Sequence, residues 1–162
     1  MYPWIVFLHV AATFGFVLAH GASAAAAFAL RRERNPERIR ALLILSTSTF
    51  NVMYLSLLVL LASGIAAGVM GRWWGRGWIW ASLGVLIAIM VGMTIFGTSL
   101  YGPVRKAVGL EFFENWRPHP PIEPASAEEI DSLLSRGQPV LLTIIGYGGL
   151  LIILWLMMFK PF

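Results

Sequence analysis

Four long apolar segments dominate this sequence, and none of them contains a lysine, an arginine or an acidic residue. They cover residues 3–30, 41–70, 78–101 and 139–159. Each is long enough to cross a hydrocarbon core about 30 Å thick, which takes about 20 helical residues. Apolar residues make up 58% of the chain and charged residues 12%, which excludes a water-soluble domain. The sequence therefore predicts an all-α, polytopic membrane protein, a single four-helix up-down bundle over residues 1–162.

The only sizeable polar piece is the loop at residues 103–138, between the third and fourth segments. Its middle, residues 116–124, contains four prolines and is expected to be extended. Ser126 and Glu129 then form a capping-box pattern, followed by a narrow apolar stripe. We expect a short interfacial helix there, lying at the membrane surface.

The basic residues predict the orientation of the bundle. Nine of the twelve lysines and arginines lie in two loops, residues 31–40 and 103–138. The positive-inside rule places these loops in the cytoplasm and both termini outside it, in a multi-pass protein of the bacterial inner (plasma) membrane. Because the basic residues sit at helix ends, facing lipid head groups, the expected partner is the bilayer and not nucleic acid. The chain has no cysteine, which excludes disulfides, iron–sulfur clusters and thiolate metal sites.

His9 and His20 are the only side chains in the four segments that titrate near neutral pH. An ionisable group inside a bilayer is costly and by default marks a functional site. Eleven residues are close to three helical turns, so in a straight helix the two rings lie within about 20° of each other around the axis and about 16 Å apart along it. We therefore predict that both histidines are metal or haem ligands on one stripe. Ser63 and Ser82 are the nearest polar candidates at the depth of His9.

Counting residues from the helix ends places three polar side chains near the depth of His20 in an antiparallel bundle. Asn51 and Tyr147 share its level, and Tyr54 lies one turn above Asn51. A ligating histidine needs its second ring nitrogen held by a hydrogen bond, and Asn51 or Tyr54 is a candidate for that role. The predicted cofactor site thus comprises His9, His20, Asn51, Tyr54 and Tyr147. The alternative is a layer of plain interhelical hydrogen bonds, each worth about 0.6 kcal/mol.

The sequence also resembles known families. The features in common are an aromatic-rich first turn followed by Leu8-His9-Val10, a short Arg-rich loop, and a last helix that closes with Lys160-Pro161-Phe162. They resemble the copper-resistance protein D family with its uncharacterised relatives and, more distantly, the four-helix bacterial protoporphyrinogen oxidases, which bind haem. The resemblance implies a functional role for His9. The oxidases also rely on a lysine in the third-helix region, whereas the first lysine here is Lys106, at the end of that segment.

Three functions remain open from the sequence. The first is a haem b protein with an electron-transfer or redox role, a membrane oxidoreductase; the resemblance favours His9 as axial ligand, and polar surroundings favour His20. The second is a copper-handling protein that uses His9, His20 and nearby methionines. The third is a cofactor-free accessory subunit of a larger membrane complex. Bis-histidine haem ligation would require a second protomer, so a homodimer is a further candidate assembly.

Overall fold

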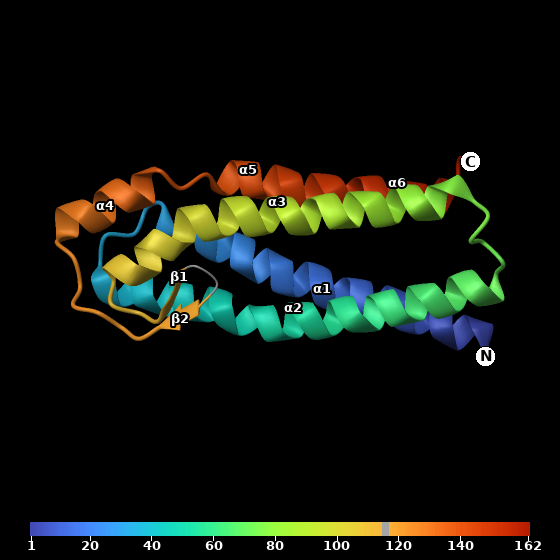
Figure 1. The fold of residues 1–162 in the computed structure, drawn as a ribbon, viewed down its shortest axis with the longest axis horizontal. Coiled ribbons are helices and arrows are strands. Elements are labelled where there is room, and N and C mark those ends of the chain that lie inside the picture. The colour runs from blue at the N-terminus through green and yellow to red at the C-terminus, as the bar shows by residue number, and fades with distance from the viewer. Residues whose placement is uncertain (115–116) are drawn as a thin grey trace.

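The computed structural model, which describes residues 1–114 and 117–162, contains four long apolar spans arranged as a bundle (Figure 1). The spans are α1 (Tyr2–Leu30), α2 (Pro36–Met70), α3 (Gly77–Ala107) and a fourth formed by α5 (Pro139–Thr143), η1 (Ile144–Gly148) and α6 (Gly149–Phe159). Each is long and apolar enough to cross a membrane. The predicted four-helix membrane bundle is therefore confirmed, and the chain is a multi-pass membrane protein.

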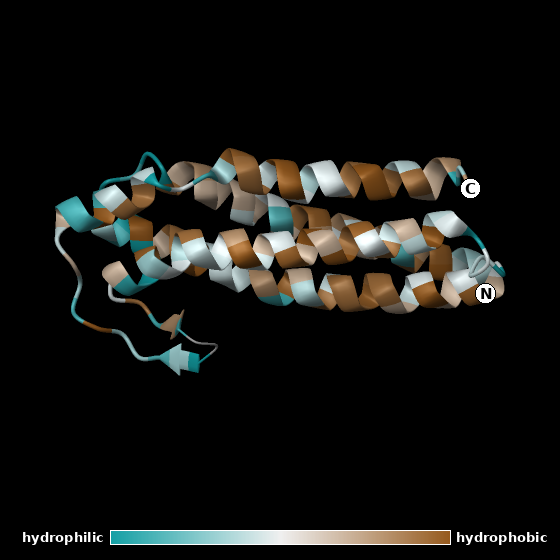
Figure 2. Cartoon of the chain, turned by 45° about the horizontal axis from the view of Figure 1, so that its top comes forward, coloured by the Kyte–Doolittle hydropathy of each residue, from teal (hydrophilic) through white to brown (hydrophobic). Residues whose placement is uncertain are grey.

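The polar segments gather at one end of this bundle. Here lie the turn at residues 31–35, the hairpin of β1 (Phe112–Glu114) and β2 (Arg117–His119), and α4 (Ala127–Ser135); both chain termini lie at the opposite end (Figure 1). We call these the loop end and the terminal end. Apolar residues cover the spans between them, whereas hydrophilic residues concentrate in the connecting segments (Figure 2). The two Arg-bearing loops therefore share one end, as an up-down topology requires.

The second helix starts earlier than the apolar pattern predicted, at Pro36 and not at residue 41. The Asn35 side chain accepts hydrogen bonds from the backbone N–H groups of Glu37 and Arg38, at 2.9 and 3.3 Å. Asparagine at the N-cap and proline at the first helical position are a favoured start. Hydropathy marks the part of a helix that crosses the membrane, and the helix itself continues into charged residues.

The proline-rich loop contains a two-stranded antiparallel hairpin at its start. Phe112 pairs with His119, and their rings stack with centroids 5.3 Å apart and planes 13° from parallel. The predicted extended stretch covers β2 and the irregular chain after it, while residue 116 lies outside the described residues. The His119 ring therefore has a packing role in the hairpin, against Phe112.

The α4 helix covers the ends of the spans. The predicted capping box is present in part, because the Ser126 hydroxyl accepts a hydrogen bond from the Glu129 backbone N–H at 3.3 Å. Ile130 and Leu134 are buried in a core shared with Leu30, at the end of α1. The apolar stripe of this helix therefore packs against the protein.

The α1 and α2 helices form a close antiparallel pair. Along α1, buried or half-buried side chains recur at alternating steps of three and four residues: His9, Ala12, Phe16, Ala19, Ser23, Ala26 and Leu30. A sustained seven-residue repeat is typical of helices that wind around each other with a left-handed supercoil. The Ser23 and Ser46 hydroxyls meet at 2.9 Å across this interface, and His9 bonds α2 near its other end.

Candidate functional site around two histidines

His9 faces α2 and is held there by two hydrogen-bonding groups. Its Nδ1 lies 2.9 Å from the Leu60 carbonyl oxygen and 3.2 Å from the Ser63 hydroxyl. The ring also lies against Gly64, where a Cβ would stand only 3.0 Å from Cε1. The prediction that Ser63 is the polar neighbour of His9 is thus confirmed, and the small residue after it admits the ring.

These contacts determine which nitrogen of His9 carries the proton in the neutral ring. A carbonyl oxygen only accepts, so Nδ1 must donate to Leu60. The Ser63 hydroxyl donates its proton to the Val59 carbonyl oxygen at 2.6 Å. Its oxygen can therefore only accept a hydrogen bond from Nδ1 of His9. Nε2 therefore keeps its lone pair, and it is neither hydrogen-bonded within the described residues nor enclosed by them. This is the state of a metal-ligating histidine, whose other nitrogen is fixed by a carbonyl.

His20 lies in different surroundings. It is buried, with 6% of its surface exposed, and its ring lies between Phe16 and Tyr147, at centroid distances of 6.2 and 5.0 Å. Its Nε2 is buried and has no hydrogen-bond partner among the described residues. His20 is thus packed as an aromatic ring.

The ring of His20 fits because the fourth span changes its helical geometry opposite it. Residues Ile144–Gly148 form a π-helical turn, and a Cβ placed on Gly146 would overlap the Nε2 atom of His20. Tyr147, from the same turn, brings its hydroxyl so close to Gly21 that a Cβ there would lie 2.9 Å away. Turns of this kind are rare and often mark functional positions. Hydropathy does not predict this turn; the closely spaced Gly146, Gly148 and Gly149 are the signal that points to it.

The two histidines face different helices, so the predicted common stripe is wrong. His9 contacts α2, whereas His20 contacts η1 of the fourth span. The estimate assumed a straight helix, in which eleven residues leave an offset of about 20°. A supercoiled helix with a 3.5-residue repeat turns further per residue, which raises the offset to about 50°.

The predicted polar layer is correct in part. His20 and Tyr147 are in contact, and the pairing of Ser23 with Ser46 puts Asn51 at about the height of His20. However, Asn51 is exposed and forms no hydrogen bond with a described residue. Tyr54 is 52% exposed and packs against Phe50. Neither Asn51 nor Tyr54 orients a histidine.

Other polar residues do not extend the site. Ser82 is buried and donates to the Trp78 carbonyl of its own helix at 2.8 Å. Within residues 1–114 and 117–162, no three histidine, aspartate or glutamate side chains cluster as a metal ion would require. A copper site that joins His9 to His20 would have to span two helix interfaces, because His9 contacts α2 and His20 contacts the fourth span.

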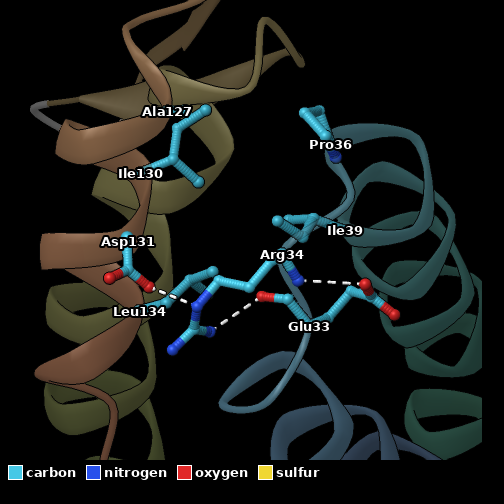
Figure 3. Close-up of a pocket in the computed structure, with 8 residues that line it drawn as sticks. All are labelled: Glu33, Arg34, Pro36, Ile39, Ala127, Ile130, Asp131 and Leu134. Carbon is cyan, nitrogen blue, oxygen red and sulfur yellow. Dashed lines mark hydrogen bonds and ion pairs between the residues drawn. The ribbon is translucent and has the colours of Figure 1, made fainter.

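A surface crevice lies at the loop end, far from both histidines along the bundle. It is formed by α4 and the turn after α1, and the Arg34 side chain closes it (Figure 3). The Arg34 guanidinium lies 2.6 Å from the Asp131 carboxylate and donates to the Glu33 carbonyl at 2.9 Å. Backbone N–H groups of Asn35 and Arg34 bond the Glu33 carboxylate and lower its pKa. The ion pair and the buried Ile130 show that this crevice is the interface where α4 packs against the turn after α1.

Comparison with known proteins gave no match: no family model, curated protein or solved structure is significantly similar to this chain.

Proposed function

We propose that this protein is a membrane haem b protein with an electron-transfer or redox role, and that His9 is its axial ligand. One observation carries the proposal: Nδ1 of His9 donates to the Leu60 carbonyl, which leaves the Nε2 lone pair unused and accessible. A carbonyl that orients an imidazole in this way also raises its basicity as a ligand. When bound, haem supplies an iron that exchanges single electrons.

The number of available ligands favours haem over copper. A porphyrin provides four nitrogens of its own, so one protein imidazole is enough to hold it. A copper ion in a protein needs several convergent side chains, and the described residues contain no cluster of three histidine, aspartate or glutamate side chains at His9. The copper-handling alternative would therefore have to draw further ligands from methionines.

His20 takes no part in ligation in this proposal. Its Nε2 lies against Gly146 in a close-packed contact, and no iron can approach that atom without displacement of η1. The resemblance to haem-binding four-helix families, in which an early histidine of the first helix is functional, points to the same residue, His9. A cofactor-free accessory role is the alternative if no haem binds.

The orientation belongs to the same proposal. We propose that the loop end faces the cytoplasm and the terminal end faces outward in the bacterial inner membrane, because nine of twelve basic residues lie at the loop end. His9 would then lie nearer the outer surface. The chain lacks cysteine, so single Pro36→Cys and Ala125→Cys variants can be labelled in intact cells. Labelling by an impermeant reagent from outside would overturn this orientation.

An optical spectrum tests the haem proposal directly. The protein would be expressed with a haem precursor, purified, and examined for a Soret band and for haem per chain. We expect haem in the wild type, near-complete loss in His9→Ala, and retention in the matched control His20→Ala. A His9→Met variant gives a second measurement, because a thioether ligand would shift the spectrum without leaving an empty space.

Two results would contradict the proposal. One is a colourless wild type from cells in which a co-expressed b-type cytochrome is fully loaded. The other is loss of haem in His20→Ala with retention in a monodisperse His9→Ala preparation. Metal analysis of the same colourless sample would then distinguish the copper-handling role from the accessory role.

A further inference from the structure

The α2 helix has two opposite faces, and α1 covers only one of them. The α2 positions that contact α1 include Ser46, Ser56, Leu60 and Ser63. Their spacing fits a heptad stripe. A position two residues further along a helix lies about 200° around it, so a second stripe displaced by two residues lies on the far side.

That second stripe also follows a strict heptad spacing, and every position in it is exposed. We call it the outer seam; it consists of Ile44, Ser48, Asn51, Leu55, Leu58, Ala62, Ile65 and Val69. Leu55 and Leu58 are each 65% exposed, and Val69 is 61% exposed. Steps of four and three alternate along its whole length, which is the pattern of helices that pack in a left-handed supercoil.

Asn51 lies in the outer seam, near the middle of the membrane, without a partner among the described residues. The exposed serine and threonine hydroxyls of the spans satisfy themselves: those of Ser48, Thr94 and Thr98, for example, each donate to a carbonyl of their own helix. A carboxamide has two donors and an acceptor, and Asn51 makes no such local bond. Hydrocarbon offers no hydrogen bonds, so an unmatched amide there is costly.

We propose that the outer seam of α2 is a homodimer interface in which Asn51 of one chain hydrogen-bonds Asn51 of a second copy. The carboxamide is complementary to itself, because each copy donates an N–H to the carbonyl oxygen of the other. All copies of the chain insert with one orientation, so their α2 helices are parallel and equivalent residues meet at a two-fold axis. An asparagine at one position of an apolar heptad seam is a known device for specifying register and partner number.

The exposed faces of α3 and α6 differ from the outer seam. The exposed side of α3 carries Thr94 and Thr98, whose hydroxyls are already bonded within the helix. On α6 the exposed side chains are apolar, such as Leu151 and Leu154. Such faces are satisfied by lipid. Asn51 distinguishes the outer seam from these faces. A hydrogen bond between Asn51 residues of two copies would satisfy the amide groups of both chains.

Single-cysteine cross-linking tests the interface on the full chain in native membranes, because the chain has no cysteine of its own. Leu55→Cys and Leu58→Cys would be oxidised with copper phenanthroline and run on non-reducing gels. We expect a disulfide-linked dimer from both. Ile87→Cys on α3 is the matched control, since Ile87 is 63% exposed, and it should remain monomeric.

A second experiment isolates the carboxamide. Dimerisation would be measured in lipid vesicles by single-molecule photobleaching as a function of protein-to-lipid ratio. Asn51→Val should weaken association by about 3- to 30-fold, the range expected for interhelical hydrogen bonds in lipid. Thr94→Val, which removes an exposed hydroxyl already bonded to its own helix, should leave association unchanged.

Two results would overturn the proposed dimer, and a third would contradict the role of Asn51. A wild type that is monomeric at every ratio overturns it, as does equal cross-linking from the α2 and α3 positions. A dimer that is unchanged by Asn51→Val shows that the seam does not depend on the amide and contradicts the role of Asn51. None of these results depends on whether haem is bound, so the dimer and the haem proposal can fail separately.

Discussion

His9 and His20 lie eleven residues apart on α1, yet that helix presents them to two different kinds of surroundings. His9 is half-buried against the backbone of α2, and one of its nitrogens is hydrogen-bonded while the other has no partner among the described residues. His20 is buried against a glycine-containing π-helical turn, and its Nε2 is covered but not hydrogen-bonded by any described residue. The first surroundings hold an imidazole by hydrogen bonds, and the second pack it between aromatic rings.

This difference teaches that burial alone does not identify a site in a membrane protein. The more deeply buried histidine packs its Nε2 atom against Gly146, so burial there reflects close helix packing. What qualifies His9 is a donor contact on one nitrogen together with access to the other. Four substitutions, each at one of the two histidines or at a residue in contact with it, test this contrast.

The largest effect is expected when a methyl group is added opposite His20. Gly146→Ala places a Cβ where Nε2 of His20 lies, so the protein should lose about 1–3 kcal/mol of stability through overpacking. Stability would be measured by SDS titration in mixed micelles. The double variant Gly146→Ala with His20→Ala should recover most of the loss. Gly84→Ala is the control, because nothing lies within 4 Å of its Cβ. Full stability of Gly146→Ala would show that the two helices do not meet there.

The next effect concerns His9. His9→Phe keeps the size of the ring but removes the bond to the Leu60 carbonyl, so we expect a loss of about 1–2 kcal/mol in the same assay. Any haem should be lost with it. Stability equal to that of the wild type would mean that the Leu60 contact does not hold the ring.

The same substitution at the other histidine should behave differently. His20→Phe replaces an unbonded ring between Phe16 and Tyr147 by an apolar one of similar shape. We expect stability within about 0.5 kcal/mol of the wild type, or a gain, since removing an unsatisfied buried nitrogen is favourable. A loss as large as that of His9→Phe would remove the contrast between the two histidines.

A comparably small effect is expected at Ser63. Ser63→Ala removes one of the two groups that Nδ1 of His9 contacts and leaves the shorter bond to Leu60 in place. The cost should be about 0.6 kcal/mol, typical of a hydrogen bond between membrane helices. Haem content should stay constant, and the position of the Soret band is the sensitive measurement. Complete haem loss would indicate that Ser63, and not the carbonyl, orients the ring.

Several features of the fold follow from local sequence. The four spans are predicted by length and hydropathy, and the start of α4 by Ser126 and Glu129. The contact between His9 and Ser63 followed from counting depth in an antiparallel pair. The ends of the helices were predicted less accurately. Asn35 caps α2 before the apolar segment begins, and hydropathy detects only that segment. These properties are local, since each depends on residues within one turn or on the thickness of the bilayer.

The direction in which each side chain points was decided by the tertiary structure alone. The placement of Asn51 on an outward face, the separation of the two histidines, and the π-helical turn opposite His20 all depend on it. In a soluble helix the polar face indicates the direction of water, but a spanning helix is apolar all round because lipid and protein interior are equally apolar. The sequence by itself therefore determined how many helices cross the membrane and at what depth each polar group lies. Only helix packing decided which neighbour each group meets, α2 for His9 and the fourth span for His20.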